Sequence, residues 1–548
     1  MALEDAAPPA TLDPAHVGDI EGAFGTLKQN YAGTARDHTW RGRLRLLLII
    51  VGPGLIVMGG GNDAGGVETY AQMGQTYGVK LLWALVLLFP ILFICQEMVV
   101  RLGAVSGVGH ARLIFDRFGK IWGWFSIADL LIVLAVSVVT EFIGVSQTFS
   151  YFGLSRFLAV PITAVLLFAV IAGRSYRYWE RFLIGLVVLN FLSFPLLFVG
   201  HSALSATAHG AVPSLPGGLT ADLLLFIVAI IGTTVEPWQL FFQQASIVDK
   251  RIGPRWIQFE RADLGIGVVV ELVGGIAIMV GAAFGLAHTS LLGGSSDVTT
   301  IAHVLSSHWG REVGWMITLA MFDGSLIGAN LIGLTAVYVL GEALGTRHSL
   351  RWKPRQAPWF YGVYAALVVV SAVIVLMPGN PLGLIIEAVA ALNGVLLPIA
   401  LVFLLLLAND RPVLGPWVNG PWQNAITGVI VWCMVALSLA TTATYFFPNL
   451  SLTLLDVGLL VTAGVGMIGG LVVWRLQSRR ARIPALAGLT RGESKAELTR
   501  LRTAWRTPRL DTLEKPVLSP LRRAGLVTLR AYVLVSVALL IIKMISFA

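Results

Sequence analysis

Charged residues are scarce in this sequence. Asp, Glu, Lys and Arg make up 13% of the 548 residues, whereas hydrophobic residues make up 56% and the mean hydropathy is +0.79. About a quarter of the residues in a soluble globular protein are charged, so this composition excludes that class and indicates an integral membrane protein. The chain is far too long for a single membrane anchor, and we therefore expect an all-α polytopic bundle.

Cysteine, metal-binding histidine patterns and nucleotide-binding motifs are also lacking. Cys95 and Cys433 both lie in apolar runs, which argues against a disulfide framework or a thiolate metal site. None of the 9 His residues falls in a metal-binding spacing, and the glycine-rich "GGGNDAGG" lacks the Lys-Ser/Thr ending of a nucleotide loop. Because no nucleophile–base pair or cofactor motif is present either, we expect neither an enzyme nor a bound cofactor.

Long apolar runs dominate the chain instead. A membrane-spanning helix needs about 20 mostly apolar residues. Runs of this kind occupy residues 46–77, 80–104, 121–150, 157–173, 180–200, 221–247, 259–288, 311–345, 358–377, 383–408, 425–446 and 455–475. We expect these twelve runs to span the membrane, with a thirteenth span at 531–548.

Lys and Arg gather in alternate loops between these runs. They precede the first run and recur in the second, fourth, sixth and eighth loops, whereas the odd loops have almost none. The positive-inside rule then places the N-terminus on the cytoplasmic side of the cell (inner) membrane. The net charge of +9 is thus a matter of topology and does not indicate a nucleic-acid partner. Residues 1–45, which contain no signal-peptide core, are expected to be a mobile cytoplasmic tail, and the basic residues 476–530 a cytoplasmic segment touching anionic lipid.

Two of the expected spans are interrupted. The first reads "MGGGNDAGGVETYAQ" from Met58 to Gln72, and the sixth contains "IIGTTVEPWQ", with Gly232 and Pro237 in the middle of the run. Broken backbone at membrane depth is tolerated only where it is buried in protein or lines a wet cavity. Interrupted helices at corresponding places in two halves of a chain indicate a transporter built from inverted repeats. Asp63 and Glu236 lie beside the two interruptions.

These stretches resemble the NRAMP family of divalent metal transporters. "VGPGLIVMGGGNDAGGVETYAQMGQTYGVKLLW" is similar to the family's first span and places Asp63 on the family's Asp, while Gly66 stands where the family has Asn. "QEMVVRLGAVSGVG" and "TEFIG" are similar to motifs of the second and third spans. In the sixth span, Glu236 replaces the family's Met and Trp238 replaces its His.

The resemblance implies a leucine-transporter-like fold of two inverted five-helix repeats, with a metal site between spans one and six. The expected division is a tail at 1–45, the first repeat at 46–200, the second repeat at 201–408, spans eleven and twelve at 409–475, the basic segment at 476–530 and the last span at 531–548.

The resemblance also supplies candidate site residues. Asp63 and Glu236 are the expected metal ligands, and further contributors to the substrate site are Asn62, Gly66, Thr233 and Glu387, the last standing where the family tends to have Gln. Roles in proton movement or gating are expected for Glu141, Glu271 and Glu68. Structural alternatives exist for several of these: a helix cap for Asp63 and Asn62, a protonated buried acid for Glu236 and Glu271, a buried structural pair for Glu141, and a hydroxyl that bonds back to its own helix for Thr233.

Two other acids lie in or near the expected spans. Asp323 is a further cavity candidate, and Glu97 is expected to form an ordinary helix-face pair with Arg101, four residues later.

The chemistry of the expected site favours hard cations. Thioether ligands suit softer transition metals, whereas carboxylates, carbonyls and water suit Mg²⁺, Ca²⁺ and Mn²⁺. Mg²⁺ is usually held by one or two carboxylates and keeps several waters. We therefore expect a secondary transporter or facilitator of Mg²⁺ first and Mn²⁺ second, working by alternating access. The alternatives are a transporter of an organic cation or amino acid, with Trp238 offering a cation–π contact, and a membrane receptor that does not transport.

Overall fold

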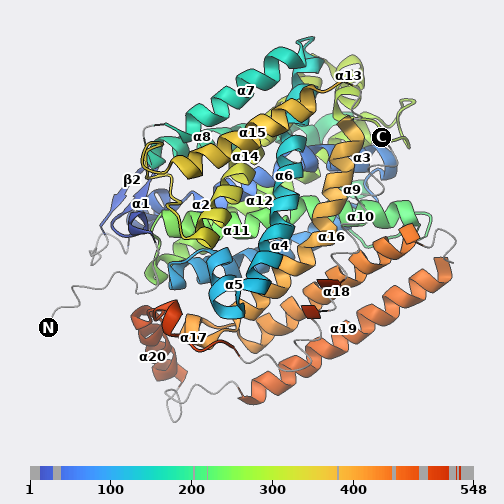
Figure 1. Ribbon diagram of the computed structural model, residues 1–548. Coiled ribbons are helices and arrows are strands. Elements are labelled where there is room, and N and C mark those ends of the chain that lie inside the picture. Colours follow the sequence, from blue (N-terminus) through green and yellow to red (C-terminus); the bar gives the residue numbers. More distant parts are fainter. Residues whose placement is uncertain are drawn as a thin grey trace.

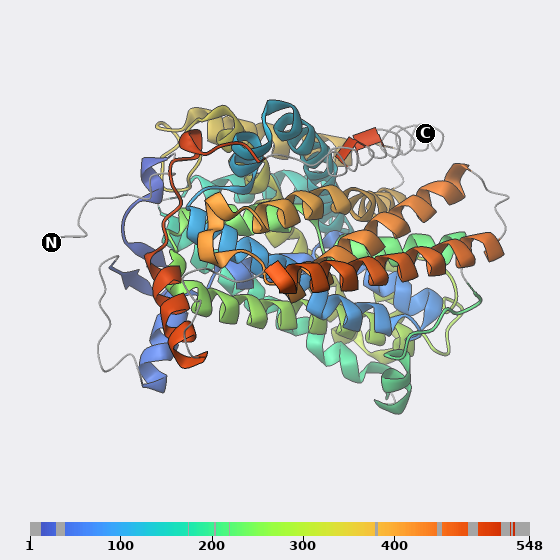
Figure 2. The same ribbon diagram turned by 90° about the horizontal axis from the view of Figure 1, so that it is seen from below.

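The computed structural model describes residues 13–28, 39–173, 175–201, 204–218, 220–378, 382–446, 452–480, 491–516, 526–527 and 530–531. Within these residues the protein is a bundle of long helices (Figures 1 and 2) with one small antiparallel hairpin near the N-terminus, formed by β1 (Ile20–Gly22) and β2 (Gly25–Leu27). The all-α polytopic fold class is as predicted.

The helices follow one another with short connections. Those of the first predicted repeat are α1 (Trp40–Ile50), α2 (Pro53–Gly59), α3 (Ala64–Tyr77), α4 (Leu82–Ser106), α5 (His110–Phe118), α6 (Lys120–Tyr151), α7 (Arg156–Ile171) and α8 (Tyr176–Leu189), the last continued by a 3₁₀ segment, η4 (Asn190–His201). Those of the second are α9 (Leu204–Gly210), α10 (Ala221–Thr234), α11 (Pro237–Asp249), α12 (Ile257–Gly285), α13 (Val298–Trp309), α14 (Arg311–Leu344), α15 (Pro358–Leu376) and α16 (Leu382–Ala408). The remainder comprises α17 (Arg411–Leu414), α18 (Pro421–Phe446), α19 (Leu452–Arg480) and α20 (Arg491–Ala504).

The predicted spans correspond to these helices. Ten helices of the described chain are long and apolar enough to cross a membrane, and the bent pair α1 and α2 raises the number to 11. The run predicted at 157–173 forms the apolar helix α7, which has 16 residues and is shorter than these candidate spans. The predicted thirteenth span lies outside the described residues except for its first position.

The first span is broken in the way its glycines predict. α1 and α2 meet at an angle of 59° at Gly52, whose φ of +155° is strained for residues with a side chain, and Pro53 then starts α2. After α2 the chain makes one 3₁₀ turn, η3 (Gly60–Asn62), and Asp63 is extended before α3 begins. The break is thus shorter than the stretch 59–66 expected from the glycines.

The sixth span breaks at the C-terminal end of the stretch that its sequence indicated. Gly232 remains helical in α10, whereas Val235 and Glu236 are non-helical and Pro237 starts α11. Gly232 serves packing instead, because a Cβ at this position would overlap the backbone of Gly394 in α16. Small residues therefore let α10 and α16 approach closely.

The two central helices of the bundle are α12 and α14. α14 is largely buried, between α6, α13, α15 and the first-span break, and α12 packs along both halves of the first span. α18 and α19 lie side by side at the edge of the bundle (Figure 1). The site described below therefore lies deep in the protein, between α12, α14 and the two broken spans.

The N-terminal segment differs from the mobile tail expected from its composition. Residues 13–28 are folded onto the bundle, and Ile20, Ala23 and Leu27 are buried. Part of the basic C-terminal segment is also packed against protein: Trp505 in the 491–516 stretch donates its indole N–H to the Val413 carbonyl at 3.0 Å. Composition alone did not reveal either contact, because both pair segments that are far apart in the sequence.

Candidate metal site at the two helix breaks

Asp63 lies at the first-span break as the N-cap of α3. Its Oδ1 accepts a hydrogen bond from the Gly66 N–H at 2.9 Å, and the neighbouring Ala64 N–H donates to Oε2 of Glu141 at 3.1 Å. Two carboxyl groups therefore share the first turn of α3, where the helix dipole favours negative charge. The capping role considered for Asp63 is present, and it fixes the side chain at the break.

Glu236 lies at the sixth-span break as the N-cap of α11. Its backbone N–H donates to Oε1 of Gln239 at 3.2 Å, and its Oε2 has no hydrogen-bond partner in the described protein. Asp63 is within hydrogen-bonding contact of both Glu236 and Glu141. The structure thus brings one acid from span one, one from span three and one from span six together.

No positive side chain balances these acids. Among the described residues, no Lys or Arg pairs with Asp63, Glu141 or Glu236, and the further charged neighbour of this group is another acid, Glu271 of α12. All four side chains are at most 2% exposed. Like charges in a buried site cannot all remain ionised without a compensating positive ligand. The group therefore needs a bound cation or bound protons.

Glycines make this proximity possible. A Cβ at Gly61 would overlap the Glu271 carboxyl and lie 2.9 Å from the Gln239 amide nitrogen. A Cβ at Gly328 of α14 would lie 2.8 Å from Glu141 Oε2. Larger residues at these two positions would push Glu271 and Glu141 away from the breaks.

Uncharged polar atoms surround the acids. Asn62 Oδ1 and Thr233 Oγ1 are buried without a hydrogen-bond partner in the described chain, and the Thr233 hydroxyl lies 3.2 Å from the Cβ position of Gly65. Thr234 bonds back to the Ile230 carbonyl at 2.7 Å, as expected of a helical threonine. Two oxygens close to the breaks thus remain available to a ligand.

Two polar residues of this region were not among the residues predicted from the sequence. Gln239 contacts the Glu236 backbone and lies beside Glu271. Asn190, in the middle of span five where α8 passes into η4, reaches Asn62 at 3.4 Å and the Gly59 carbonyl at 3.1 Å. Gln239 could have been found, because a helix N-cap followed three residues later by Gln is a capping-box spacing. Asn190 carries no comparable signal in the sequence.

Glu68 and Glu387 form a second acidic group, away from the breaks. Glu68 accepts from Gln72 Nε2 at 3.1 Å and from the Val298 N–H at 3.3 Å, and Glu387 accepts from the Ser295 hydroxyl at 3.4 Å. Gln72 also contacts Glu387. The structure therefore places Glu387 with Glu68 rather than beside the two expected ligands, and its role as a ligand stays a prediction.

The remaining candidates lie in different surroundings. Asp323 is 2% exposed, and neither of its oxygens has a partner in the described residues. The predicted pair of Glu97 and Arg101 is confirmed at 2.9 Å and is joined by Arg261 at 2.5 Å. Trp238 is fully buried, with its ring 3.2 Å from the Cβ position of Gly60, so it packs beneath the first-span break.

The acids do not form a closed protein cage. No group of three or more His, Cys, Asp or Glu in the described residues has the geometry to hold a metal ion. A cation at the breaks would therefore keep part of its water shell, or complete it with the uncharged oxygens of Asn62 and Thr233.

Known proteins share this architecture. A family model described as natural resistance-associated macrophage protein-like (Nramp) matches residues 54–444, which include both breaks. The chain belongs to this family. The resemblance stated from the sequence is thereby confirmed.

Relatives and solved structures agree with this membership. The chain is 24% identical over 412 residues to the divalent metal cation transporter MntH of Pectobacterium carotovorum, covering 74% of this chain and 96% of the relative. It is 27% identical over 412 residues to MntH of Ralstonia nicotianae, covering 71% and 89%. A crystal structure of the Eremococcus coleocola manganese transporter superposes with a TM-score of 0.58 at 21% identity, covering 81% of this chain and 96% of that one. These likenesses establish a multi-pass membrane protein with the NRAMP fold.

Proposed function

We propose that this NRAMP-family protein transports divalent metal cations across the cell membrane, with Asp63 and Glu236 as the central ligands. One observation carries the proposal: three buried carboxyl groups meet where two membrane spans are broken, with no basic side chain among their described neighbours. A divalent cation satisfies this excess of negative charge, and its departure requires protons or the entry of another ion. Binding of the cation at these breaks from one side of the membrane and its release to the other side fit an alternating-access mechanism.

Hard cations are the proposed substrates, with Mg²⁺ ahead of Mn²⁺. Carboxylate, amide and hydroxyl oxygens surround the breaks, and the Met expected from the family resemblance is replaced by Glu236. Oxygen ligands and retained waters suit Mg²⁺ and Mn²⁺ better than softer ions. The relatives' names mention manganese and divalent metal cations, and Mn²⁺ is accordingly the first ion to use in an assay.

Glu141 and Glu271 are proposed to take up protons when the cation leaves. Glu141 already accepts from the Ala64 N–H with one oxygen and from Thr140 at 3.3 Å with the other. Glu271 has no hydrogen-bond partner of normal geometry in the described chain. Glu68 and Glu387 are proposed to meet the cation before it reaches the breaks, because Glu387 is only partly buried.

Uptake by proteoliposomes tests the proposal. Purified protein is reconstituted, and Mn²⁺ and Mg²⁺ uptake is followed for the wild type and for Asp63→Ala. We expect Asp63→Ala to abolish uptake, because it removes a ligand and a cap together. Asp129→Asn is the matched control: this buried acid lies twelve positions before Glu141 on α6, about 18 Å away along the helix. Normal uptake by well-folded Asp63→Ala would refute the proposed site.

A further inference from the structure

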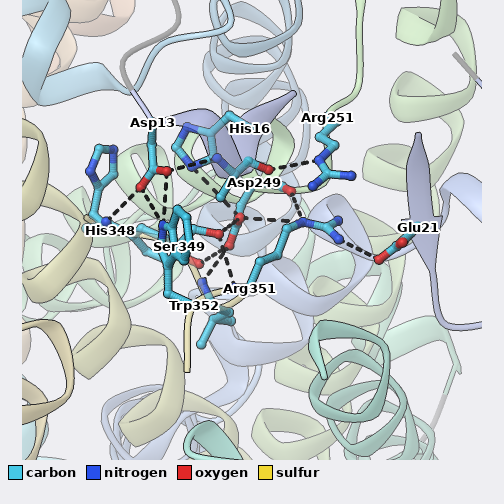
Figure 3. Close-up of polar contacts among 12 residues, drawn as sticks. Asp13, His16, Glu21, Asp249, Arg251, His348, Ser349, Arg351 and Trp352 are labelled. Carbon is cyan, nitrogen blue, oxygen red and sulfur yellow. Dashed lines mark hydrogen bonds and ion pairs between the residues drawn. The ribbon is translucent and has the colours of Figure 1, made fainter. Parts of the chain in front are cut away.

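The N-terminal residues 13–28, here named the strap, lie outside the family-matched region at 54–444. The strap consists of a 3₁₀ turn, η1 (Pro14–His16), followed by the hairpin of β1 and β2. Figure 3 shows part of its contact surface, with Asp249 at the last position of α11 surrounded by strap residues and by the α14–α15 loop. The contacts join elements that are far apart in the sequence.

Asp13 fastens the start of the strap to the α14–α15 loop. Its carboxyl accepts from the His348 N–H at 3.1 Å and from the Trp352 indole N–H at 3.0 Å, and it also caps η1 through Ala15. Burial opposes ionisation of Asp13, but these hydrogen bonds outweigh that effect and hold its pKa below the usual value. The ionised carboxylate is thus the form that holds the loop.

Asp249 joins the same loop to the end of α11. It accepts from the Tyr338 hydroxyl at 2.6 Å, from the Leu350 N–H at 3.1 Å and from the Ser349 hydroxyl. Arg351 donates to the Asp249 carbonyl at 3.1 Å and reaches back to the strap through Glu21 at 2.5 Å (Figure 3). One arginine therefore connects the strap, the loop and the end of α11.

Arg251 adds a strained link directly after α11. Its φ of +67° is unusual for a residue with a side chain. The guanidinium donates to the strap carbonyls of Ala15 at 2.9 Å and Asp19 at 3.1 Å. A strained backbone persists only where the surroundings hold it, and here the strap contributes that support.

The hairpin fastens span five as well. The Ala23 N–H donates to Glu180 Oε2 at 2.5 Å, and Arg181 donates to the Ala23 carbonyl at 2.7 Å. Glu180 in turn pairs with Lys250 at 2.6 Å, and Lys250 also donates to the Val51 carbonyl at the bend between α1 and α2. The strap thus contacts, directly or through Lys250, the ends of both half-helices that lead to the breaks.

These half-helices connect the strap to the candidate metal site. α11 has 13 residues and runs from the Glu236 break to Asp249, about 20 Å. α2 runs from the bend at Gly52 to the break before Asp63, and Asp263 of α12 binds its first turn through the Gly54 N–H at 2.8 Å. Opening the bundle at this end requires movement of the C-terminal end of α11 or the N-terminal end of α2. The contacts with Arg351 and Asp263 restrain these two ends.

We propose that the strap is a latch that keeps the protein closed at the face where α11 ends, and that each transport cycle requires its release. The loop charges predict this face to be cytoplasmic. The release of the strap in each transport cycle rests on the proposed function, whereas the stabilisation of the closed conformation by the strap does not.

His16 supplies a way to control the latch. The side chain is 5% exposed, stacks edge-on against His348 at 5.2 Å and has its Nε2 3.8 Å from Asp249. Burial lowers its pKa to about 4, against the opposing effect of Asp249; the other charged groups facing it are Asp13 and Arg351. His16 is therefore neutral in the latched state, and protonation favours release.

Thiol labelling tests the latch without relying on transport. Ser246 of α11 is 3% exposed, so Ser246→Cys in a background without Cys95 and Cys433 reports opening of this face. We expect Asp13→Ala to raise the labelling rate by roughly tenfold or more, because it removes the hydrogen bonds to His348 and Trp352. Lys28→Ala, at the exposed end of the strap, is the matched control and should leave the rate unchanged.

Locking the strap tests the second half of the proposal. Glu21→Cys with Arg351→Cys, joined by a reducible bifunctional reagent, should stop Mn²⁺ uptake while leaving Mn²⁺ binding intact, and reduction should restore uptake. Single-cysteine proteins treated in the same way control for the reagent. Unchanged labelling in Asp13→Ala, or full uptake by the locked protein, would overturn the latch. Increased labelling in a protein that never transports Mn²⁺ or Mg²⁺ would instead uphold the latch and refute the proposed function.

Discussion

Replacing Lys250 by methionine should destabilise the protein more than any surface change. The Lys250 ammonium lies 2.6 Å from Glu180, both side chains are fully buried, and the same nitrogen donates to the Ile50 and Val51 carbonyls at 2.7 and 2.8 Å. Lys250→Met leaves the Glu180 charge and two carbonyls without their donor. Removing one partner of a buried ion pair costs about 3–5 kcal/mol.

A matched double variant separates this cost from the effect of changed packing. In Lys250→Met/Glu180→Gln the uncompensated charge is absent, and the Gln oxygen can still accept from the Ala23 N–H, which donates to Glu180 at 2.5 Å. Thermal unfolding of the purified proteins should rank the wild type first, the double variant second and Lys250→Met last. The reasoning would be refuted if Lys250→Met had the same melting temperature as the wild type, or if the double variant melted at a lower temperature than Lys250→Met.

Three further outcomes are expected. In Glu236→Met, Cd²⁺ should inhibit Mn²⁺ uptake more strongly and Mg²⁺ less strongly than in the wild type, because a thioether favours softer ions. Unchanged inhibition by both ions would show that Glu236 is not a ligand. The pKa of His16 is about 4 in the docked strap and about 6.5 when the strap is free, so the released strap binds an extra proton, and docking is strongest above pH 6.5 and weakens as the pH falls toward 4. The labelling rate of Ser246→Cys, normalised to that of an exposed cysteine, should therefore rise roughly 25-fold from pH 7.5 to pH 5. His16→Gln should remove most of this pH dependence. Gly232→Ala should lower the thermal midpoint by the equivalent of about 1–3 kcal/mol through overpacking against Gly394, whereas Gly428→Ala, where nothing lies near the added Cβ, should not.

Features set by local sequence were predictable. Apolar runs gave the spans because a helix crossing lipid must be apolar over about 20 residues, and the glycines before Asp63 gave the first break. The sixth break lies within the predicted stretch from Gly232 to Pro237, although Gly232 itself stays helical because it packs against another backbone. There Pro237 was the better signal, because Pro at the first helical position marks a helix start.

Depth and long-range contacts were less predictable. Glu387 lies only five positions into α16, and its place near one end of the bundle follows from that position rather than from the residue type. The N-terminal tail was expected to be mobile because it is rich in Ala, Pro, Asp and Gly, yet Asp13 binds His348, 335 positions away. Contacts of this kind depend on the complete fold and leave no local periodicity.

The most direct test of the proposed site is ion binding measured by calorimetry on the purified protein. Mn²⁺, Mg²⁺ and Ca²⁺ are titrated into the wild type, Asp63→Ala, Glu236→Ala and the control Asp129→Asn. We expect the wild type and the control to bind Mg²⁺ and Mn²⁺, and we expect Asp63→Ala and Glu236→Ala to lose this binding. Binding that survives both substitutions, or a wild type that binds no divalent ion, would contradict a metal site at the two helix breaks.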